Sequence, residues 1–299
     1  MLPQRIHTVT EFHRLMGLHD PDHPLISLID TGSLRRPGNK ERESFVYDFY
    51  VVILKKNPRV KLKFGRLECD FDGGVLLFMA PDQLLTLESR ESDPSKPTSG
   101  WLLLVHPDYL WGTSLAQAIK RYEFFDYAAS EALFLSDKEE ASLVGIFLNI
   151  QLEYRSGIDN YSQSIIIAQL ELLLSYSGRF YHRQFITRKV PHHQILDRLE
   201  ELLAARLQNE ALPTVQSLAD QLNISPNYLS SLLKVLTGQT AQQHIQEKII
   251  DKAKEMLSTT DLSVNEIAYR LGFGYPQSFT RLFKLKTDVS PSEFRQAFR

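Results

Sequence analysis

The chain has 299 residues, of which 43% are hydrophobic and 23% charged, and its net charge at pH 7 is −2. This length predicts two domains, and the near-neutral charge argues against a protein that coats nucleic acid over its whole surface, although a local basic face remains possible. With a single cysteine, Cys69, the chain forms neither an internal disulfide nor a cysteine-based zinc site.

The N-terminal segment lacks the apolar run of a secretory signal, and no window approaches the roughly 18 apolar residues of a membrane span. We therefore expect a cytoplasmic protein that makes no membrane contact. His7, His13, His19 and His23 are scattered at spacings of four to six residues. This spacing favours a flexible N-terminal segment over a metal site.

From about residue 44 to 105, short runs rich in valine, phenylalanine, tyrosine and leucine alternate with turn signals such as Asn57-Pro58 and Gly73-Gly74. These runs predict antiparallel strands arranged as a barrel or a sandwich. Five aromatic residues on them are candidates for lining an effector cavity, although aromatic residues in strands are more often core: Phe45, Tyr47, Phe49, Phe64 and Phe78.

From about residue 112 to 181 the apolar period lengthens to that of helices. Ser136 and Asp137 predict the start of a long helix, and a second long helix follows the turn sequence Gly157–Asn160. The surplus of isoleucine and leucine on this hairpin predicts either a dimer seam or packing against the strands. We place a linker at 186–193, where the chain is polar and interrupted by Pro191, and we expect only helices beyond it.

The C-terminal region contains an internal repeat. Leu218, Ala219, Leu222 and Ile224 recur as Ile267, Ala268, Leu271 and Phe273 after 49 residues, and Leu229 and Leu233 recur as Phe279 and Phe283 after 50 residues. Ser263 and Glu266 form a capping-box pattern, Gly272 supplies a helix stop, and Ser225-Pro226 is a helix start. Each copy therefore predicts a helix-turn-helix, at about 214–238 and 263–287, joined by an amphipathic helix at about 241–257.

A connecting helix of about 17 residues is a rod of roughly 25 Å, which suits two recognition helices one turn of duplex apart. Residues 275–286 hold three cations and no acid, so the electrostatic footprint is expected there, with Arg281 as the first candidate for a base contact. The candidate DNA contacts are Asn227, Tyr228, Ser230, Ser231, Lys234, Tyr275, Gln277, Ser278, Arg281, Lys284 and Lys286.

These motifs resemble the DNA-binding domain of AraC/XylS-type transcriptional regulators. The second copy carries the signature residues Gly272-Phe273, Phe283-Lys284 and Ser290-Pro291, whereas Asp288 stands where the family usually has glycine. The resemblance implies an α+β multidomain fold, with a cupin-like antiparallel β-barrel at 1–111, a helical hairpin for dimerisation at 112–185 and an all-α DNA-binding domain at 194–299. It also implies double-stranded promoter DNA, RNA polymerase, a second copy of the chain and an unknown small-molecule effector as partners, with no cofactor.

The rival interpretation is a cupin-type enzyme or ligand carrier whose C-terminal domain mediates protein contacts. The strand region lacks the His-x-His and carboxylate pattern that a metal-dependent cupin enzyme needs. Ser231 and Lys234 match a Ser-x-x-Lys spacing, but its partner motifs are absent. We therefore expect a transcriptional regulator and no enzyme. The family resemblance favours an activator, although the residues themselves do not decide between an activator and a repressor.

Overall fold

A computed structural model describes residues 3–33, 42–56, 62–64, 67–69, 74–88, 99–128, 131–156, 159, 161–187 and 189–297. The chain divides into two compact units, an N-terminal unit (Met1–Gln184) and a C-terminal unit (Phe185–Arg299). Among the described residues, no helix is long and apolar enough to span a bilayer.

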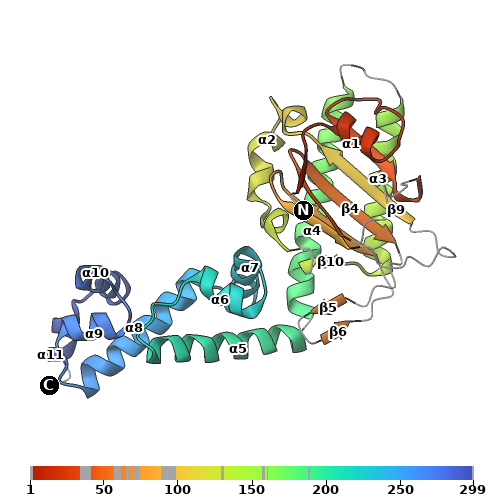
Figure 1. The fold of residues 1–299 in the computed structure, drawn as a ribbon. Helices are drawn as coiled ribbons and strands as arrows, with labels where there is room; N and C mark the ends of the chain where they lie inside the picture. Colours follow the sequence, from red (N-terminus) through yellow and green to blue (C-terminus); the bar gives the residue numbers. More distant parts are fainter. Residues whose placement is uncertain are drawn as a thin grey trace. The chain divides into compact units, whose positions relative to one another are not determined.

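The N-terminal unit is built on two open β-sheets (Figure 1). One sheet has the strand order β1-β3-β8, with strands β1 (Gln4–Ile6), β3 (Arg42–Tyr47) and β8 (Leu84–Glu88). The other has the order β10-β7-β4-β9-β2, with strands β10 (Leu133–Phe134), β7 (Val75–Met79), β4 (Tyr50–Lys56), β9 (Ser99–Val105) and β2 (Ile26–Asp30). β5 (Leu62–Phe64) pairs with β6 (Leu67–Cys69) in a separate two-stranded sheet. The described strands therefore form no closed barrel, which corrects the barrel expected from the sequence.

Several strands that are adjacent in sequence belong to different sheets. β3 pairs with β8, whereas the intervening β4 and β7 pair with each other. The turn at Pro81-Asp82 thus leads from one sheet to the other, and Asp82 adopts a φ of 68° there. β7 and β8, which follow one another along the chain, therefore do not pair with each other.

One core cluster of this unit lies between the two sheets. Phe45, Tyr47 and Phe49 are buried there and pack against one another, with Tyr47 and Phe49 ring centroids 5.3 Å apart. Phe78 is buried elsewhere, with its ring centroid 4.4 Å from that of Phe124. These four residues fill the core rather than line a cavity, while the Phe64 side chain is outside the described part of the chain.

The N-terminal segment is ordered, which corrects the expectation of a flexible one. β1 is followed by α1 (Val9–Leu15), whose N-cap Thr8 accepts a hydrogen bond from the Glu11 amide. His13 is buried, and its ring nitrogens bond the His19 carbonyl at 2.6 Å and the Ser27 hydroxyl at 2.8 Å. These partners lie too far along the chain for periodicity to reveal them.

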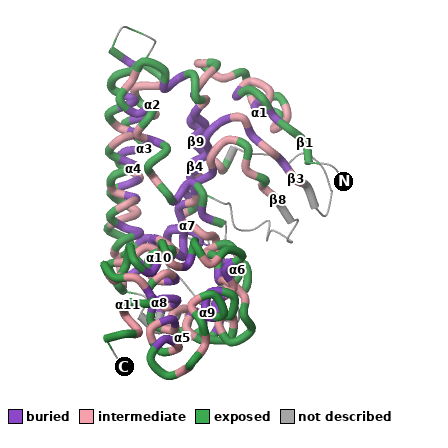
Figure 2. The backbone as a smooth tube through the Cα atoms, turned by 90° about the vertical axis from the view of Figure 1, so that its left-hand side faces the viewer, coloured by how far each residue is buried: buried purple, intermediate pink, exposed green. Residues whose placement is uncertain are grey.

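Two long helices cover the five-stranded sheet on the face away from β1, β3 and β8 (Figures 1 and 2). α3 (Asp137–Arg155) starts at the predicted Ser136 cap, and its Phe147 ring stacks on Trp101 of β9. α4 (Ser162–Thr187) follows, and Arg183 binds both carboxylate oxygens of Glu139 at 3.0 and 2.7 Å. The predicted helical hairpin is therefore present.

The connection after β9 contains α2 (Leu115–Ala118) and the short 3-10 helices η2 (Pro107–Leu110), η3 (Ile119–Arg121) and η4 (Glu123–Asp126). Another 3-10 helix, η1 (Thr31–Ser33), follows β2.

Between residues 189 and 297 the structure contains helices and no strand. The helices are α5 (Lys189–Gln208), α6 (Val215–Leu222), α7 (Pro226–Thr237), α8 (Ala241–Thr259), α9 (Val264–Arg270), α10 (Pro276–Thr287) and α11 (Pro291–Gln296). Residues 189–193 of the predicted linker belong to α5. The helix tolerates Pro191 because this proline is its third residue, where the backbone N–H would have no partner within the helix.

Candidate nucleic-acid interface

The first helix-turn-helix consists of α6 and α7. The Thr214 hydroxyl caps α6 by accepting from the Ser217 amide, and Asn223 ends the helix in the left-handed conformation. The Ser225 hydroxyl then accepts from the Tyr228 amide, and Pro226 occupies the first helical position of α7. The turn is therefore defined by local signals, as the sequence predicted.

The second helix-turn-helix consists of α9 and α10. The predicted capping box is present, because the Ser263 amide donates to the Glu266 carboxylate at 2.7 Å and the Glu266 amide donates to the Ser263 hydroxyl at 3.2 Å. Gly272 follows α9 with a φ of 85°, and Asp288 ends α10 with a φ of 62°. The four left-handed residues Asn223, Gly238, Gly272 and Asp288 thus occupy matching places in the two copies.

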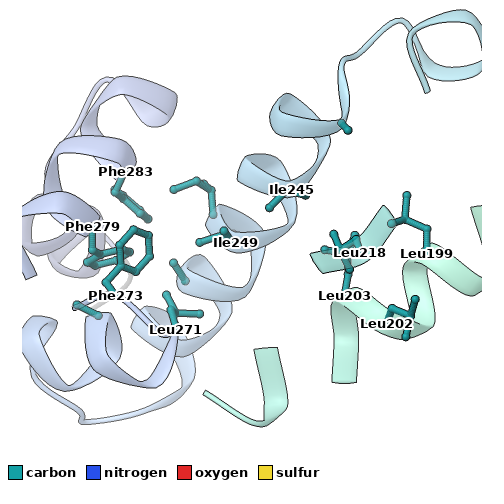
Figure 3. Packing of buried hydrophobic residues seen from close by; sticks show 14 of the residues in the cluster. Leu199, Leu202, Leu203, Leu218, Ile245, Ile249, Leu271, Phe273, Phe279 and Phe283 are labelled. Atoms are coloured by element: carbon teal, nitrogen blue, oxygen red, sulfur yellow. The ribbon is translucent and has the colours of Figure 1, made fainter. Parts of the chain in front are cut away.

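α8 joins the two copies and supplies their shared core (Figure 3). Ile245 and Ile249 of α8 lie in the same apolar cluster as Leu218 of the first copy and Phe279 of the second. Figure 1 shows α7 and α10 toward opposite ends of this helix. At about 1.5 Å per residue, the 19 residues of α8 span roughly 28 Å. Six apolar residues of α7 and α10 are buried or partly buried: Leu229, Leu232, Leu233, Phe279, Leu282 and Phe283.

α5 packs against α8 and the first helix-turn-helix. The sequence pattern placed a linker where this helix begins, so its full length was not predicted. Glu200 of α5 receives hydrogen bonds from two side chains one turn apart on α8, His244 at 2.9 Å and Lys248 at 2.8 Å. Partial burial opposes ionisation of Glu200, but the Lys248 and His244 hydrogen bonds outweigh burial and lower its pKa below the ordinary value. Leu199, Leu202 and Leu203 of α5 also enter the C-terminal core.

α10 presents a polar, basic face to solvent. Gln277, Arg281 and Lys284 are exposed and lie at spacings of four and three residues, so they share one side of the helix, with Ser278 beside them. Tyr275, just before the helix, is 74% exposed. Among the described residues Arg281 has no ion-pair partner, so its guanidinium is available to an external acceptor. We call Gln277, Ser278, Arg281 and Lys284 the α10 face.

α7 presents a narrower face than the sequence predicted. Asn227, Ser230 and Lys234 lie on its outer side, and Lys234 is exposed. Ser230 is half-buried, and its hydroxyl accepts from the Ala241 amide at 3.4 Å, so it contributes to the start of α8. Tyr228 is completely buried and Ser231 is 9% exposed, which corrects their assignment to the DNA-contacting surface.

Tyr228 is buried because residues far from it in sequence surround it. Its ring packs edge-on against Phe185 at a centroid distance of 5.1 Å, and its hydroxyl lies 3.3 Å from Nε2 of His192. The Nδ1 of His192 bonds the Phe185 carbonyl at 2.8 Å. Because a carbonyl only accepts, Nδ1 carries a proton, and in the neutral ring Nε2 accepts from the Tyr228 hydroxyl.

Lys286 is exposed but lies away from the α10 face. It is five residues after Arg281, about 140° around the helix, and it borders a groove together with Gln239, Glu247 and Asp251. Lys286 therefore offers a matched control for Arg281 and Lys284, because it is a cation on the same helix but on another side. Among the described residues, no cluster of three or more histidine, cysteine or acidic side chains is placed to hold a metal ion.

Asp288 supports a test of the repeat. A non-glycine residue in the left-handed conformation costs about 1–2 kcal/mol, less for aspartate than for most residues, and Gly238 occupies the matching place in the first copy. We expect Asp288→Gly to stabilise the C-terminal unit by about 0.5–1 kcal/mol. The midpoint of urea unfolding checks this, and a midpoint that falls would show that the aspartate side chain stabilises the turn.

Comparisons with known proteins agree on the C-terminal region. A family model described as a helix-turn-helix domain matches residues 218–297. The uncharacterized transcriptional regulatory protein YesN of Bacillus subtilis (strain 168) is 30% identical over 275 residues, covering 88% of this chain and 70% of YesN. The HTH-type transcriptional activator RhaS of Citrobacter koseri is 40% identical over 81 residues, which cover 27% of this chain and 29% of RhaS.

Among solved structures, the chain is similar to the DNA-binding domain of AdpA, crystallised in complex with a target DNA. The two are 29% identical, the match covers 34% of this chain and 92% of that one, and the TM-score is 0.31. The C-terminal domain of AraT, a response regulator from Geobacillus stearothermophilus, is 30% identical over 37% of this chain and 88% of that one, with a TM-score of 0.33.

Proposed function

Because this chain belongs to the AraC family of DNA-binding transcriptional regulators, we propose that its two helix-turn-helix units read one promoter sequence in successive major grooves. The α10 face supplies the main base and phosphate contacts, and the outer side of α7 supplies the others. One observation carries this proposal: Arg281 is exposed on a recognition helix, and no carboxylate among the described residues neutralises it.

The remaining contacts are assigned by position. Arg281 pairs with a guanine edge, where a guanidinium makes two hydrogen bonds, and Lys284 and Lys234 bind phosphates. Asn227, Gln277 and Ser278 occupy the first turns of their helices, which enter a groove first. Tyr275 lies next to them and is available to pack on the sugar-phosphate backbone.

The chain acts by binding rather than by catalysis in this proposal. RhaS is named as a transcriptional activator. We propose that this chain also activates transcription, by recruiting RNA polymerase to the promoter to which it is bound. A small-molecule effector that binds the N-terminal unit controls the activity. A repressor is the alternative outcome, and transcription of a reporter from the bound promoter with and without the protein distinguishes the two.

Arg281→Ala tests the base-reading role. We expect it to weaken binding to the selected promoter site by about 1–3 kcal/mol, or roughly 5- to 150-fold, and to relax the preference at one base pair. Selection from a randomised duplex library provides the site, and fluorescence anisotropy measures the affinities. Circular dichroism confirms that the variant is folded.

Lys286→Ala is the matched control for Arg281→Ala, because it removes a cation from the same helix but from the side bordering the Gln239–Asp251 groove. We expect it to weaken binding uniformly over sequences and by much less. If Arg281→Ala retains the wild-type base preference at every position, Arg281 does not read the sequence.

The helical hairpin is our proposed homodimer interface. α3 exposes Leu148 and Leu152 one turn apart, 43% and 70% accessible, and α4 exposes Ile165 and Leu172 two turns apart, 42% and 43% accessible. Exposed leucine and isoleucine repeated along a helix mark a surface that another helix covers. A second copy of the chain exposes the same residues of α3 and α4, so a two-fold symmetric interface would pack these apolar surfaces of the two copies against each other.

Leu152→Lys tests this interface. A charge in the centre of an apolar seam is expected to raise the dimer dissociation constant at least tenfold. Sedimentation equilibrium measures that constant. Leu84→Lys, which changes an equally exposed leucine on β8, should leave it unaltered. Equal weakening by both substitutions would place the interface elsewhere.

A further inference from the structure

The N-terminal unit contains a cavity of about 390 Å³, a size that suits a small organic ligand. Its walls come from the segment that enters β2, from η2 after β9, and from the end of α3 and the beginning of α4. None of Phe45, Tyr47, Phe49 and Phe78, the described aromatic residues proposed from the sequence, lines it, so sequence reasoning did not predict this site. The lining residues are spread along the chain from Asp22 to Ile166, so no short sequence motif marks the site.

The cavity has an apolar floor and fixed polar walls. Ile26, Ile166 and Tyr109 are buried at its base. The rings of His23 and Tyr109 meet edge to face at a centroid distance of 5.2 Å, and the Tyr154 hydroxyl accepts from the Asp22 amide at 2.8 Å. These contacts hold the walls in place without a ligand, which reduces the conformational cost of binding.

The charges around the cavity are of one sign. Asp22, Asp108 and Glu153 line it, and a fourth carboxylate, Asp159, is occupied in capping α4, where it accepts from the Tyr161 and Ser162 amides. Among the residues that the structure describes, the lining contains no lysine and no arginine.

The three titratable rings of the lining, His23, Tyr109 and Tyr154, stay neutral, and burial raises the pKa of Tyr154 above its ordinary value. Burial lowers the pKa of His23, whose Nδ1 accepts from the Leu25 amide at 3.1 Å, so its ring is uncharged at pH 7. Burial, assisted by the nearby Glu153, raises the pKa of Tyr109 to about 12, so its hydroxyl keeps its proton. The net charge of the lining is therefore negative.

We propose that this cavity binds a small organic cation, an amine or an amidine, with its charge toward Glu153 and Asp22 and its body against Tyr109, Tyr154 and Ile166. Tyrosine faces attract cations, carboxylates neutralise them, and the apolar floor accepts a hydrocarbon body. An organic anion would face three carboxylates without a counterion. A bare metal ion is disfavoured because the acidic side chains among the described residues are not clustered as ligands.

This inference rests on the proposed function, since it identifies the effector site of a ligand-controlled regulator. The cavity joins the end of α3 to the start of α4, so its occupant contacts both helices of the proposed dimer interface. Binding of the cation is therefore expected to change dimer stability and, through it, DNA affinity.

The test is calorimetric titration of the full chain with two series of ligands, each matched in size and shape and varied in charge. Tyramine, tyrosol and 4-hydroxyphenylacetate share a body and differ in charge, as do 1,4-diaminobutane, 1,4-butanediol and succinate. We expect at least one of the two cations to bind saturably, at least tenfold more tightly than its neutral counterpart, and both anions to show no binding. A cation that binds no better than its neutral counterpart in both series, or an anion that binds best, overturns the proposal.

Two variants place the binding in this cavity. Glu153→Gln should weaken the cation at least fivefold, whereas Asp137→Asn, at the other end of α3 and outside the lining, should not. Equal affinities for the two variants would overturn the assignment. Binding of the same preparations to the selected promoter site separates the two proposals: intact DNA binding without cation binding refutes this inference alone, and absent DNA binding refutes the proposed function.

Discussion

Gly272→Ala is expected to destabilise the C-terminal unit by more than about 3 kcal/mol. The glycine has a φ of 85°, and a β-carbon there would lie 2.2 Å from the Leu212 amide nitrogen and 2.8 Å from the Ala211 carbonyl carbon. These are backbone atoms, so no side-chain rotation relieves the clash. The turn of the second helix-turn-helix would have to move away from the segment between α5 and α6, and the conformational strain adds about 1–2 kcal/mol.

Gly238→Ala is the matched control. Gly238 has a similar φ of 79°, but an added β-carbon would meet no atom within 4 Å, so only the strain of about 1–2 kcal/mol remains. The difference between the two variants isolates the close backbone approach at Gly272.

The two tryptophans of the chain, Trp101 and Trp111, both lie in the N-terminal unit. Their fluorescence therefore reports that unit, while far-ultraviolet circular dichroism reports both. We expect the dichroism transition of Gly272→Ala to fall by roughly 10 °C or more while the fluorescence transition stays in place. If Gly272→Ala and Gly238→Ala shift it equally, the backbone approach makes no contribution.

The C-terminal fold was predictable because its signals are local. The Ser263–Glu266 capping box, the Ser225-Pro226 start and the left-handed Asp288 each depend on residues within one helical turn, and all three are present. Because the pattern recurs about 50 residues later, the same reasoning predicted both helix-turn-helix units. The α10 face followed from the same argument, since the exposed side of a short amphipathic helix is fixed once its buried side is known.

The N-terminal architecture was less predictable because strand partners are distant in sequence. Strand composition located β3, β4, β7 and β9, but whether β7 pairs with β8 or with β4 depends on contacts that alternating hydrophobicity does not encode. The cavity near Tyr109 was hidden for the same reason. Its walls come from three separated segments, none of which carries a motif.

Tyr228 is a case in the helical domain where contacts distant in sequence also escaped prediction. Its place at the start of α7 suggested a DNA contact, but Phe185 and His192, about forty residues earlier, enclose it. We expect Tyr228→Ala to destabilise the C-terminal unit by about 3–5 kcal/mol, because it leaves a large cavity and an unpaired His192 nitrogen. The dichroism midpoint measures the loss, with tryptophan fluorescence as the reference for the other unit.

Tyr228→Phe separates a core role from a DNA-contacting role. The ring remains, so the packing against Phe185 is kept, and loss of the hydroxyl bond to His192 costs about 1 kcal/mol. A buried hydroxyl cannot reach a base or a phosphate, so the site selected by this variant and its affinity per folded molecule should equal those of the wild type. A changed base preference in folded Tyr228→Phe would mean that α7 presents Tyr228 to DNA and that the enclosing contacts open on binding.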